Sequence, residues 1–167
     1  AVLDGGGQAW VAAGRRTTTE PAAPVQAGKP VEPGASLAGA VDASAVLANI
    51  AQPSFTVIDA RAANRYRGEV EPMDPVAGHI PGALNRPNGE NLQADGRFKS
   101  AEQLRAEFAS LLDGRDPASI VHQCGSGITA CHNLLSMEIA GLAGSRLYPG
   151  SWSEWCSDPS RPVAKGA

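Results

Sequence analysis

The chain has 167 residues, which is enough for one domain of about 100–150 residues together with flanking segments. Its formal net charge of −3 does not indicate a nucleic acid or an anionic membrane as partner, and no apolar run approaches the ~20 residues of a membrane span. The three cysteines, an odd number, argue against a disulfide scaffold and suit a reducing compartment, which we take to be the cytoplasm.

The first fourteen residues look like the end of a preceding domain. Residues 2–5 predict the end of a strand and a turn, and the residues up to Trp10 predict the opening of a helix. The same pattern recurs near the C-terminus, where Gly150 and Trp155 repeat the spacing of Gly5 and Trp10. This weak internal repeat indicates two related domains, with chance similarity as the alternative.

Residues 15–36, rich in Thr, Pro, Ala and Gly, are expected to be an extended linker. The main domain is expected at 37–160, followed by a tail at 161–167. In chain order, the first predicted elements are a helix capped by Asp42 or Ser44, a strand at 55–59 and a short strand at 83–85. A helix opened by a capping box at Ser100 and a strand at 119–123 follow. The last two are a helix and a strand at 146–148, and the helix carries one apolar face made of Ile128, Cys131, Leu135, Ile139 and Leu142. This alternation predicts an α/β fold with a mostly parallel sheet between helices.

The loop that begins at Cys124 carries the strongest functional signal. A cysteine between a buried strand and a helix meets unpaired backbone N–H groups, and these favour an anion at its sulfur. Gly125 and Gly127 let the backbone turn its N–H groups inward, while Ser126 and Thr129 add hydroxyl donors. The pattern predicts a nucleophilic thiolate. An inert buried cysteine is the alternative, and such a cysteine needs no loop of this kind.

Three other kinds of site fit the spacing poorly. Gly125-x-Gly127-x-x-Ala130 matches a loose dinucleotide fingerprint, but no acidic residue follows about 20 residues later. A cysteine phosphatase needs an arginine where this chain has Ala130. A zinc site would have to use His122, Cys124, Cys131 and His132. Cys131 and His132 point about 100° apart on a helix, so neither a metal nor another cofactor is expected.

The run from Cys124 to His132 resembles the active-site loop of rhodanese-type sulfurtransferases, and that of the mercaptopyruvate sulfurtransferase subfamily most closely. Further blocks look like family motifs in the family's order, at 57–61, 65–68, 78–85 and 150–155. The resemblance covers about residues 37–160. It implies a rhodanese-like fold with a central, mostly parallel five-stranded sheet and helices on both faces.

The resemblance also implies a domain arrangement and a mechanism. Family members commonly carry two rhodanese domains, with the catalytic cysteine in the second, so residues 1–14 look like the last strand and helix of an upstream domain. The resemblance implies that this upstream domain is a partner, which a separate chain could supply. Cys124 would take sulfur from 3-mercaptopyruvate or thiosulfate and pass the persulfide sulfur to a thiol such as thioredoxin, or to cyanide. Ser126 matches a serine that polarises the donor. The alternative is a non-enzymatic persulfide carrier or redox-sensing module.

The expected substrate-binding residues are Arg65, Gly125, Gly127, Ile128 and Thr129. Arg65 matches a family arginine that grips the donor carboxylate, a task that suits the two-pronged guanidinium. The second family arginine is missing, because residues 71–74 read Glu-Pro-Met-Asp.

The remaining conspicuous side chains predict structural roles. Arg61 and Arg67 are expected to pair with acids, and Asp59 to bond the backbone at the end of its strand. His79 predicts a structural hydrogen bond, and Cys131 is expected in the core. Trp152 and Trp155 indicate packing, and Cys156 has no predicted role.

Overall fold

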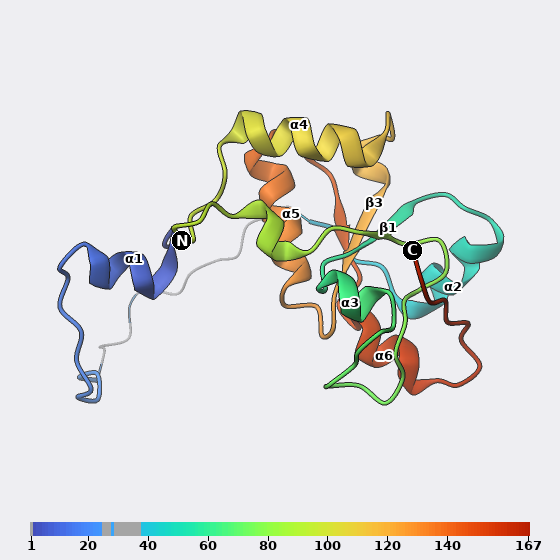
Figure 1. The fold of residues 1–167 in the computed structure, drawn as a ribbon, viewed down its shortest axis with the longest axis horizontal. Coiled ribbons are helices and arrows are strands. Elements are labelled where there is room, and N and C mark those ends of the chain that lie inside the picture. The colour runs from blue at the N-terminus through green and yellow to red at the C-terminus, as the bar shows by residue number, and fades with distance from the viewer. Residues whose placement is uncertain (1, 25–27, 29–37) are drawn as a thin grey trace.

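The computed structural model describes residues 2–24, 28 and 38–167. Half of the expected linker, residues 25–27 and 29–36, and the expected domain start at 37 lie outside the described residues. The described part contains four parallel strands in the order β2-β1-β3-β4. Figure 1 labels the two central strands, β1 and β3. The strands are β1 (Thr56–Asp59), β2 (Leu84–Asn85), β3 (Ile120–Gln123) and β4 (Arg146–Leu147).

The sheet is one strand smaller than expected. In the described residues the place of a fifth strand is taken by a single parallel bridge between Ala40 and Leu147 at the β4 edge. Two residues after Ala40, Asp42 already caps the next helix. The α/β class, the parallel pairing and the four strand positions are confirmed.

The helices are α1 (Gly6–Ala12), α2 (Ala43–Ala51), α3 (Ala63–Tyr66), α4 (Ala101–Leu112), α5 (Ala130–Ile139) and α6 (Ser151–Ser157), with short 3₁₀ turns η1 (Asn88–Asn91) and η2 (Pro117–Ser119). Two predicted caps are confirmed. The Asp42 carboxylate accepts from Ala45 N at 2.8 Å, and Ser100 forms a capping box with Gln103. Each cap satisfies N–H groups that the first turn of a helix leaves unpaired.

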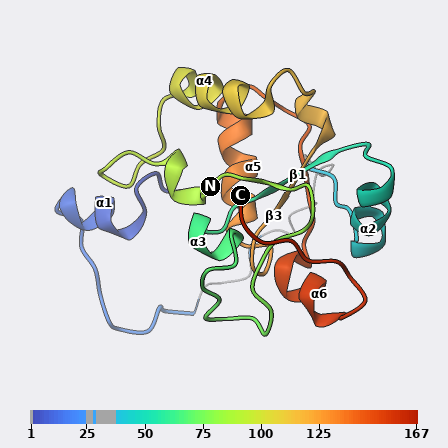
Figure 2. The ribbon, with the colours of Figure 1, turned by 45° about the vertical axis from the view of Figure 1, so that its right-hand side comes forward.

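Alternating side chains of the two central strands build a core on each face of the sheet. Val57 and Val121 pack with residues of α2 and α6, whereas Ile58 and Ile120 pack with residues of α4 and α5. Figures 1 and 2 show α4 and α5 on one side of the strands and α2 and α6 on the other. The register pairs Asp59 with Gln123, so β1 and β3 end at the same edge. The loops that leave these two strands therefore come together at that edge.

The buried face of α5 differs from the expected one. Ile128, Cys131 and Ile139 are exposed, and the buried residues are Ala130, Asn133, Ser136 and Met137. Asn133 is buried because its amide group donates to the Arg86 carbonyl oxygen at 2.8 Å and its oxygen accepts from Asn91 at 2.6 Å. A hydrogen-bonded polar network around Asn133 thus lies on the inward face of α5, where the apolar periodicity predicted hydrophobic side chains.

The two chain ends both lie against the domain. No strand forms at residues 2–5, where the Asp4 carboxylate instead accepts from Phe98 N at 2.9 Å. The segment 161–167, expected to be a tail, pairs with the turn before β2. Ala164 and His79 exchange two backbone hydrogen bonds of 2.9 Å, and Gly166 N donates to the Arg67 carbonyl oxygen. In the part of the chain that is described, no helix has both the length and the apolar character to cross a bilayer.

Candidate active site

Cys124 comes directly after the last residue of β3 and lines a cavity of about 430 Å³. Three segments supply most of the residues that line the cavity, and Asn88 and Ser153 complete the lining. The first begins after β1 and supplies Arg61 and Arg65, the second is the loop at Met73 and Asp74, and the third is the loop that begins at Cys124. The cavity thus lies at the carboxyl edge of the sheet, where parallel α/β folds bind their ligands.

Six of the seven predicted site residues line this one cavity. They are Cys124, Ser126, Arg65, Gly125, Ile128 and Thr129. Gly127, the seventh, lies where the loop passes the turn after β4. A Cβ at Gly127 would be 2.5 Å from the Pro149 carbonyl oxygen, and its φ of +83° is a conformation that side chains disfavour. Gly127 therefore shapes the loop rather than the cavity wall.

The backbone of the loop offers a set of free donors. Within the described part of the chain, the N–H groups of residues 125–129 have no hydrogen-bond acceptor. They lie between β3 and the first turn of α5, where the helix also presents its positive end. Such a row of donors stabilises an anion held against it.

The start of α6 fixes the backbone on which the cysteine stands. Cys124 N donates to Ser151 Oγ at 3.0 Å, and the Cys124 carbonyl oxygen accepts from Trp152 N at 2.9 Å. Ser153 N donates to the Gly125 carbonyl oxygen at 2.9 Å. Sequence reasoning missed Ser151, although the block at 150–155 resembles a family motif. That block therefore holds the loop in addition to packing its tryptophans.

The Cys124 side chain is more enclosed than the sequence suggested. It is 1% exposed and packs with Ala60, Ala130 and Leu147. Cys124 also lines the cavity, so the cavity is the side from which a small molecule would approach it. The burial protects the thiol from bulk solvent while the loop amides remain available to an anion.

Arg65 lies over the loop and is already paired. A Cβ at Gly125 would be 3.9 Å from Arg65 Nη1, which places the guanidinium beside the loop. The same guanidinium contacts the Glu71 carboxylate closely and lies 3.5 Å from Asp74 Oδ2. Burial alone would raise the pKa of Glu71, but hydrogen bonds from Arg65 and from the N–H groups of Met73 and Asp74 hold this pKa below its usual value.

Arg61 has the structural role predicted for it. Its guanidinium donates to both oxygens of Asp59, to Glu71 Oε2 at 3.1 Å and to the Gly78 carbonyl oxygen at 2.7 Å. It also stacks over the Trp152 ring at 4.6 Å. Asp59 accepts from Arg61 N at 2.9 Å, which is the predicted backbone bond. These contacts hold the Arg61 guanidinium between Asp59, Glu71 and the Gly78 carbonyl oxygen.

Two further predictions of structural roles are confirmed, for His79 and Arg67. His79 is buried, with Nδ1 2.8 Å from the Tyr66 carbonyl oxygen and its ring stacked on Tyr66, so the structural prediction is confirmed. Arg67 pairs with Glu69 at the surface, as predicted.

Cys131 is exposed instead of lying in the core, because α5 turns its polar network inward. Cys156 is buried, and burial raises its pKa. Among the described residues, no three His, Cys, Asp or Glu side chains gather as metal ligands would.

Comparison with known proteins shows which family this chain belongs to. The family model described as a rhodanese-like domain matches residues 42–158. The chain belongs to the rhodanese-like domain family. It is 50% identical over 165 residues to a protein of Pseudomonas aeruginosa named probable 3-mercaptopyruvate sulfurtransferase, a match that covers 99% of the chain and 57% of that protein.

Other relatives carry both sulfurtransferase names. The 3-mercaptopyruvate sulfurtransferase of Rattus norvegicus and the thiosulfate sulfurtransferase of Mus musculus are each 36% identical, with 99% of this chain and 56% of each relative covered. The chain thus spans a little over half the length of the curated relatives it matches.

Solved structures agree on the fold. The anaerobic ergothioneine biosynthesis enzyme from Chlorobium limicola superposes with a TM-score of 0.78 at 24% identity, over 99% of this chain and 41% of that one. The Tum1 protein from Saccharomyces cerevisiae superposes with a TM-score of 0.66 at 29% identity, over 76% of this chain and 46% of that one.

Proposed function

We propose that the chain is the catalytic part of a sulfurtransferase that moves a sulfane sulfur through a persulfide on Cys124. The observation that carries the proposal is the juxtaposition of one cavity-lining thiol with five backbone N–H groups that have no acceptor in the described residues. The sulfurtransferase names of relatives at 36–50% identity support the same chemistry.

In the first half-reaction, the Cys124 thiolate attacks the sulfur of 3-mercaptopyruvate. The sulfur–sulfur bond forms, the carbon–sulfur bond breaks, and its electron pair leaves on the enolate of pyruvate. The proton of the donor thiol ends on the methyl carbon of pyruvate, and a persulfide anion remains on Cys124 beside the loop amides. With thiosulfate the sulfur–sulfur bond of the donor breaks instead, and sulfite leaves with the electron pair.

In the second half-reaction, an acceptor thiolate or cyanide attacks the outer sulfur. A new bond to the acceptor forms, the persulfide bond breaks, and Cys124 regains its thiolate. In each step the sulfur is transferred without its bonding electron pair, which stays with the leaving group, so neither half-reaction needs an external oxidant or reductant. We propose a small-molecule donor and a thiol acceptor such as thioredoxin, or cyanide.

The remaining site residues bind the donor in this proposal. The Arg65 guanidinium receives the donor carboxylate. Ser126 and Thr129 line the cavity, and their hydroxyl groups donate to the donor carbonyl oxygen. Ile128 supplies an apolar edge that is 76% exposed.

The domain arrangement belongs to the same proposal. Residues 1–14 are the end of an upstream rhodanese domain, and residues 37–160 are the catalytic domain. The limited coverage of the relatives and the position of α1, which buries none of its residues, support this division (Figures 1 and 2). The three free cysteines suit a reducing compartment such as the cytoplasm.

The test is mass spectrometry of the chain after incubation with 3-mercaptopyruvate or thiosulfate. We expect the peptide that contains Cys124 to gain one sulfur atom, Cys124→Ser to abolish the gain, and Cys131→Ser, which removes an exposed thiol, to leave it unchanged. Repeated formation of thiocyanate from cyanide identifies an enzyme, whereas a single discharge identifies a persulfide carrier. A sulfur gain that survives Cys124→Ser, or no gain with either donor, overturns the proposal.

A further inference from the structure

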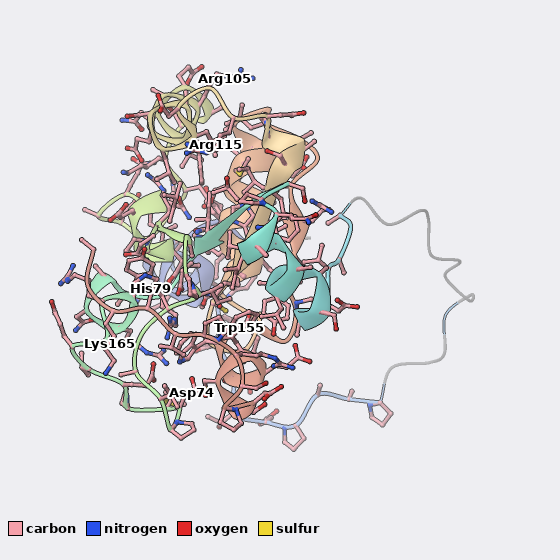
Figure 3. All side chains as sticks on the ribbon, turned by 90° about the vertical axis from the view of Figure 1, so that its right-hand side faces the viewer. Asp74, His79, Arg105, Arg115, Trp155 and Lys165 are labelled. Atoms are coloured by element: carbon pink, nitrogen blue, oxygen red, sulfur yellow. The ribbon has the colours of Figure 1, made fainter. Side chains whose placement is uncertain are left out.

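An acidic side chain lies in the cavity beside the cysteine. Asp74 lines the same cavity as Cys124, and its side chain is 10% exposed. Its Oδ2 atom is buried and accepts no hydrogen bond from the described residues, with Arg65 Nη2 as the nearby cation at 3.5 Å. Figure 3 labels Asp74, which lies on the loop beside α6, and Trp152 of α6 donates to the Val76 carbonyl oxygen of that loop at 2.8 Å.

The charges around Arg65 do not leave it as a free anion receptor. Arg61 is bonded to Asp59 and Glu71, and Glu71 is shared with Arg65. With Asp74 added, three carboxylates face two guanidinium groups. The cavity wall itself contains two cations, Arg61 and Arg65, and one anion, Asp74. An anionic donor that reaches Arg65 therefore also approaches a group of side chains in which carboxylates outnumber guanidinium groups by one.

The repulsion from Asp74 depends on the charge of the donor. Coulomb energy is proportional to the product of the two charges, so at the same position a dianion is repelled twice as strongly as a monoanion. 3-Mercaptopyruvate carries one negative charge on its carboxylate, and thiosulfate carries two. Because rate ratios depend exponentially on energy, the factor by which Asp74 lowers kcat/KM for a dianion is the square of the factor for a monoanion.

We propose that Asp74 is a specificity-determining residue that selects monoanionic sulfur donors against dianionic ones. This inference rests on the proposed function, because it concerns the donor that Cys124 accepts. Asp74 acts by cancelling the charge of Arg65 at the place where the donor's anionic group binds. The loop that carries Asp74 thereby sets the charge preference of a cavity whose cysteine loop is itself neutral.

The first test compares the two donors in charge variants. We expect Asp74→Asn to raise kcat/KM by about threefold for 3-mercaptopyruvate and about tenfold for thiosulfate, so the thiosulfate preference rises about threefold. Asp74→Ala, a second neutral variant, gives the same direction. Asp74→Glu retains the charge and the wild-type ratio. Glu69→Gln is the matched control, since Glu69 is exposed on the same stretch and pairs with Arg67.

A second test measures the field at Cys124 without any sulfur transfer. Iodoacetate and iodoacetamide alkylate the same thiol, but only iodoacetate is an anion. We expect Asp74→Asn to raise the iodoacetate-to-iodoacetamide rate ratio at Cys124 about threefold, while the ratio at the exposed Cys131 stays constant in the same sample.

The two tests separate the inference from the function on which it rests. If the donor ratio and the alkylation ratio in the neutral Asp74 variants equal those of the wild type or of Glu69→Gln, the specificity role of Asp74 is overturned. If the wild type acquires no sulfur on Cys124 but the alkylation ratio still shifts, the proposed function fails while the electrostatic role of Asp74 stands.

Discussion

The backbone N–H of Cys124 donates a hydrogen bond to the side-chain oxygen of Ser151, 3.0 Å away and 27 positions later in the chain. Ser151 Oγ in turn donates to the Tyr148 carbonyl oxygen at 2.9 Å. Ser151 is fully buried and has a φ of 53°, which is uncommon for a residue with a side chain. One hydroxyl thus ties the end of β3 to the turn after β4.

Removal of this hydroxyl is predicted to loosen the cysteine. Ser151→Ala leaves the Cys124 N–H and the Tyr148 carbonyl without their partner, so we expect the free energy of unfolding to fall by about 1–3 kcal/mol and sulfur loading of Cys124 to slow. Ser151→Gly also lacks the hydroxyl but accepts the positive φ without strain, so it should be more stable than the alanine variant. Urea unfolding and loading rates check both, and an alanine variant that behaves like the wild type would exclude this role.

Gly127 is predicted to tolerate no side chain. Gly127→Ala places a Cβ 2.5 Å from the Pro149 carbonyl oxygen and imposes strain at a φ of +83°, so the loop must move. We expect sulfur transfer to fall by more than about tenfold, because small displacements of catalytic groups have large effects on rate. Gly89→Ala is the control, since Gly89 has open space around it. Equal rates in the two variants would contradict the role given to Gly127.

Arg65 is predicted to determine donor affinity. Arg65→Gln removes the guanidinium beside Gly125, and charged hydrogen bonds contribute about 1.5–3 kcal/mol, so KM for 3-mercaptopyruvate should rise by about tenfold or more. Arg67→Gln removes an arginine two positions later that pairs with Glu69 outside the cavity, and it should change KM little. Steady-state kinetics measure KM for 3-mercaptopyruvate in both variants, and an equal change in the two would contradict the role given to Arg65.

His122 is predicted to make the fold sensitive to acid. It is fully buried in β3, where burial lowers its pKa to about 3, whereas the unfolded chain has a pKa near 6.5. Between these values the unfolded state binds the extra proton, so stability is full above about pH 6.5 and falls by up to about 1.4 kcal/mol per pH unit as the pH drops.

His122→Leu places an apolar side chain of similar size in the strand and removes the titrating ring. The variant should lose less stability than the wild type between about pH 7 and about pH 5, as measured by urea unfolding. If the free energy of unfolding falls equally with pH in the two proteins, His122 is not the source of acid sensitivity.

Local chemistry explains which parts of the fold were predictable. Asp42 and Ser100 begin helices because their side chains satisfy nearby N–H groups, and these bonds depend on neighbours within three residues. The composition of the Cys124 loop was also readable from a few consecutive residues, although bonds to Ser151 and Trp152 hold its backbone. The buried face of α5 was not, because Asn133 is stabilised by bonds to Arg86 and Asn91, which lie more than 40 positions earlier.

The candidate site also combines residues that the sequence could place together with residues that only the fold brings in. Cys124, Ser126 and Thr129 share one short loop, so spacing was sufficient to place them together. Asp74 and Ser151 reach the site through folding of the whole chain. The sequence showed an acidic segment where the family has an arginine, but it could not show that Asp74 faces the same cavity as the cysteine.

The structure of the chain after incubation with 3-mercaptopyruvate tests the central claim most directly. The account predicts an additional sulfur atom bonded to Cys124 Sγ, within hydrogen-bonding distance of backbone N–H groups of residues 125–129. An additional sulfur on Cys131 or Cys156, or an outer sulfur on Cys124 that points away from those amides, would contradict it.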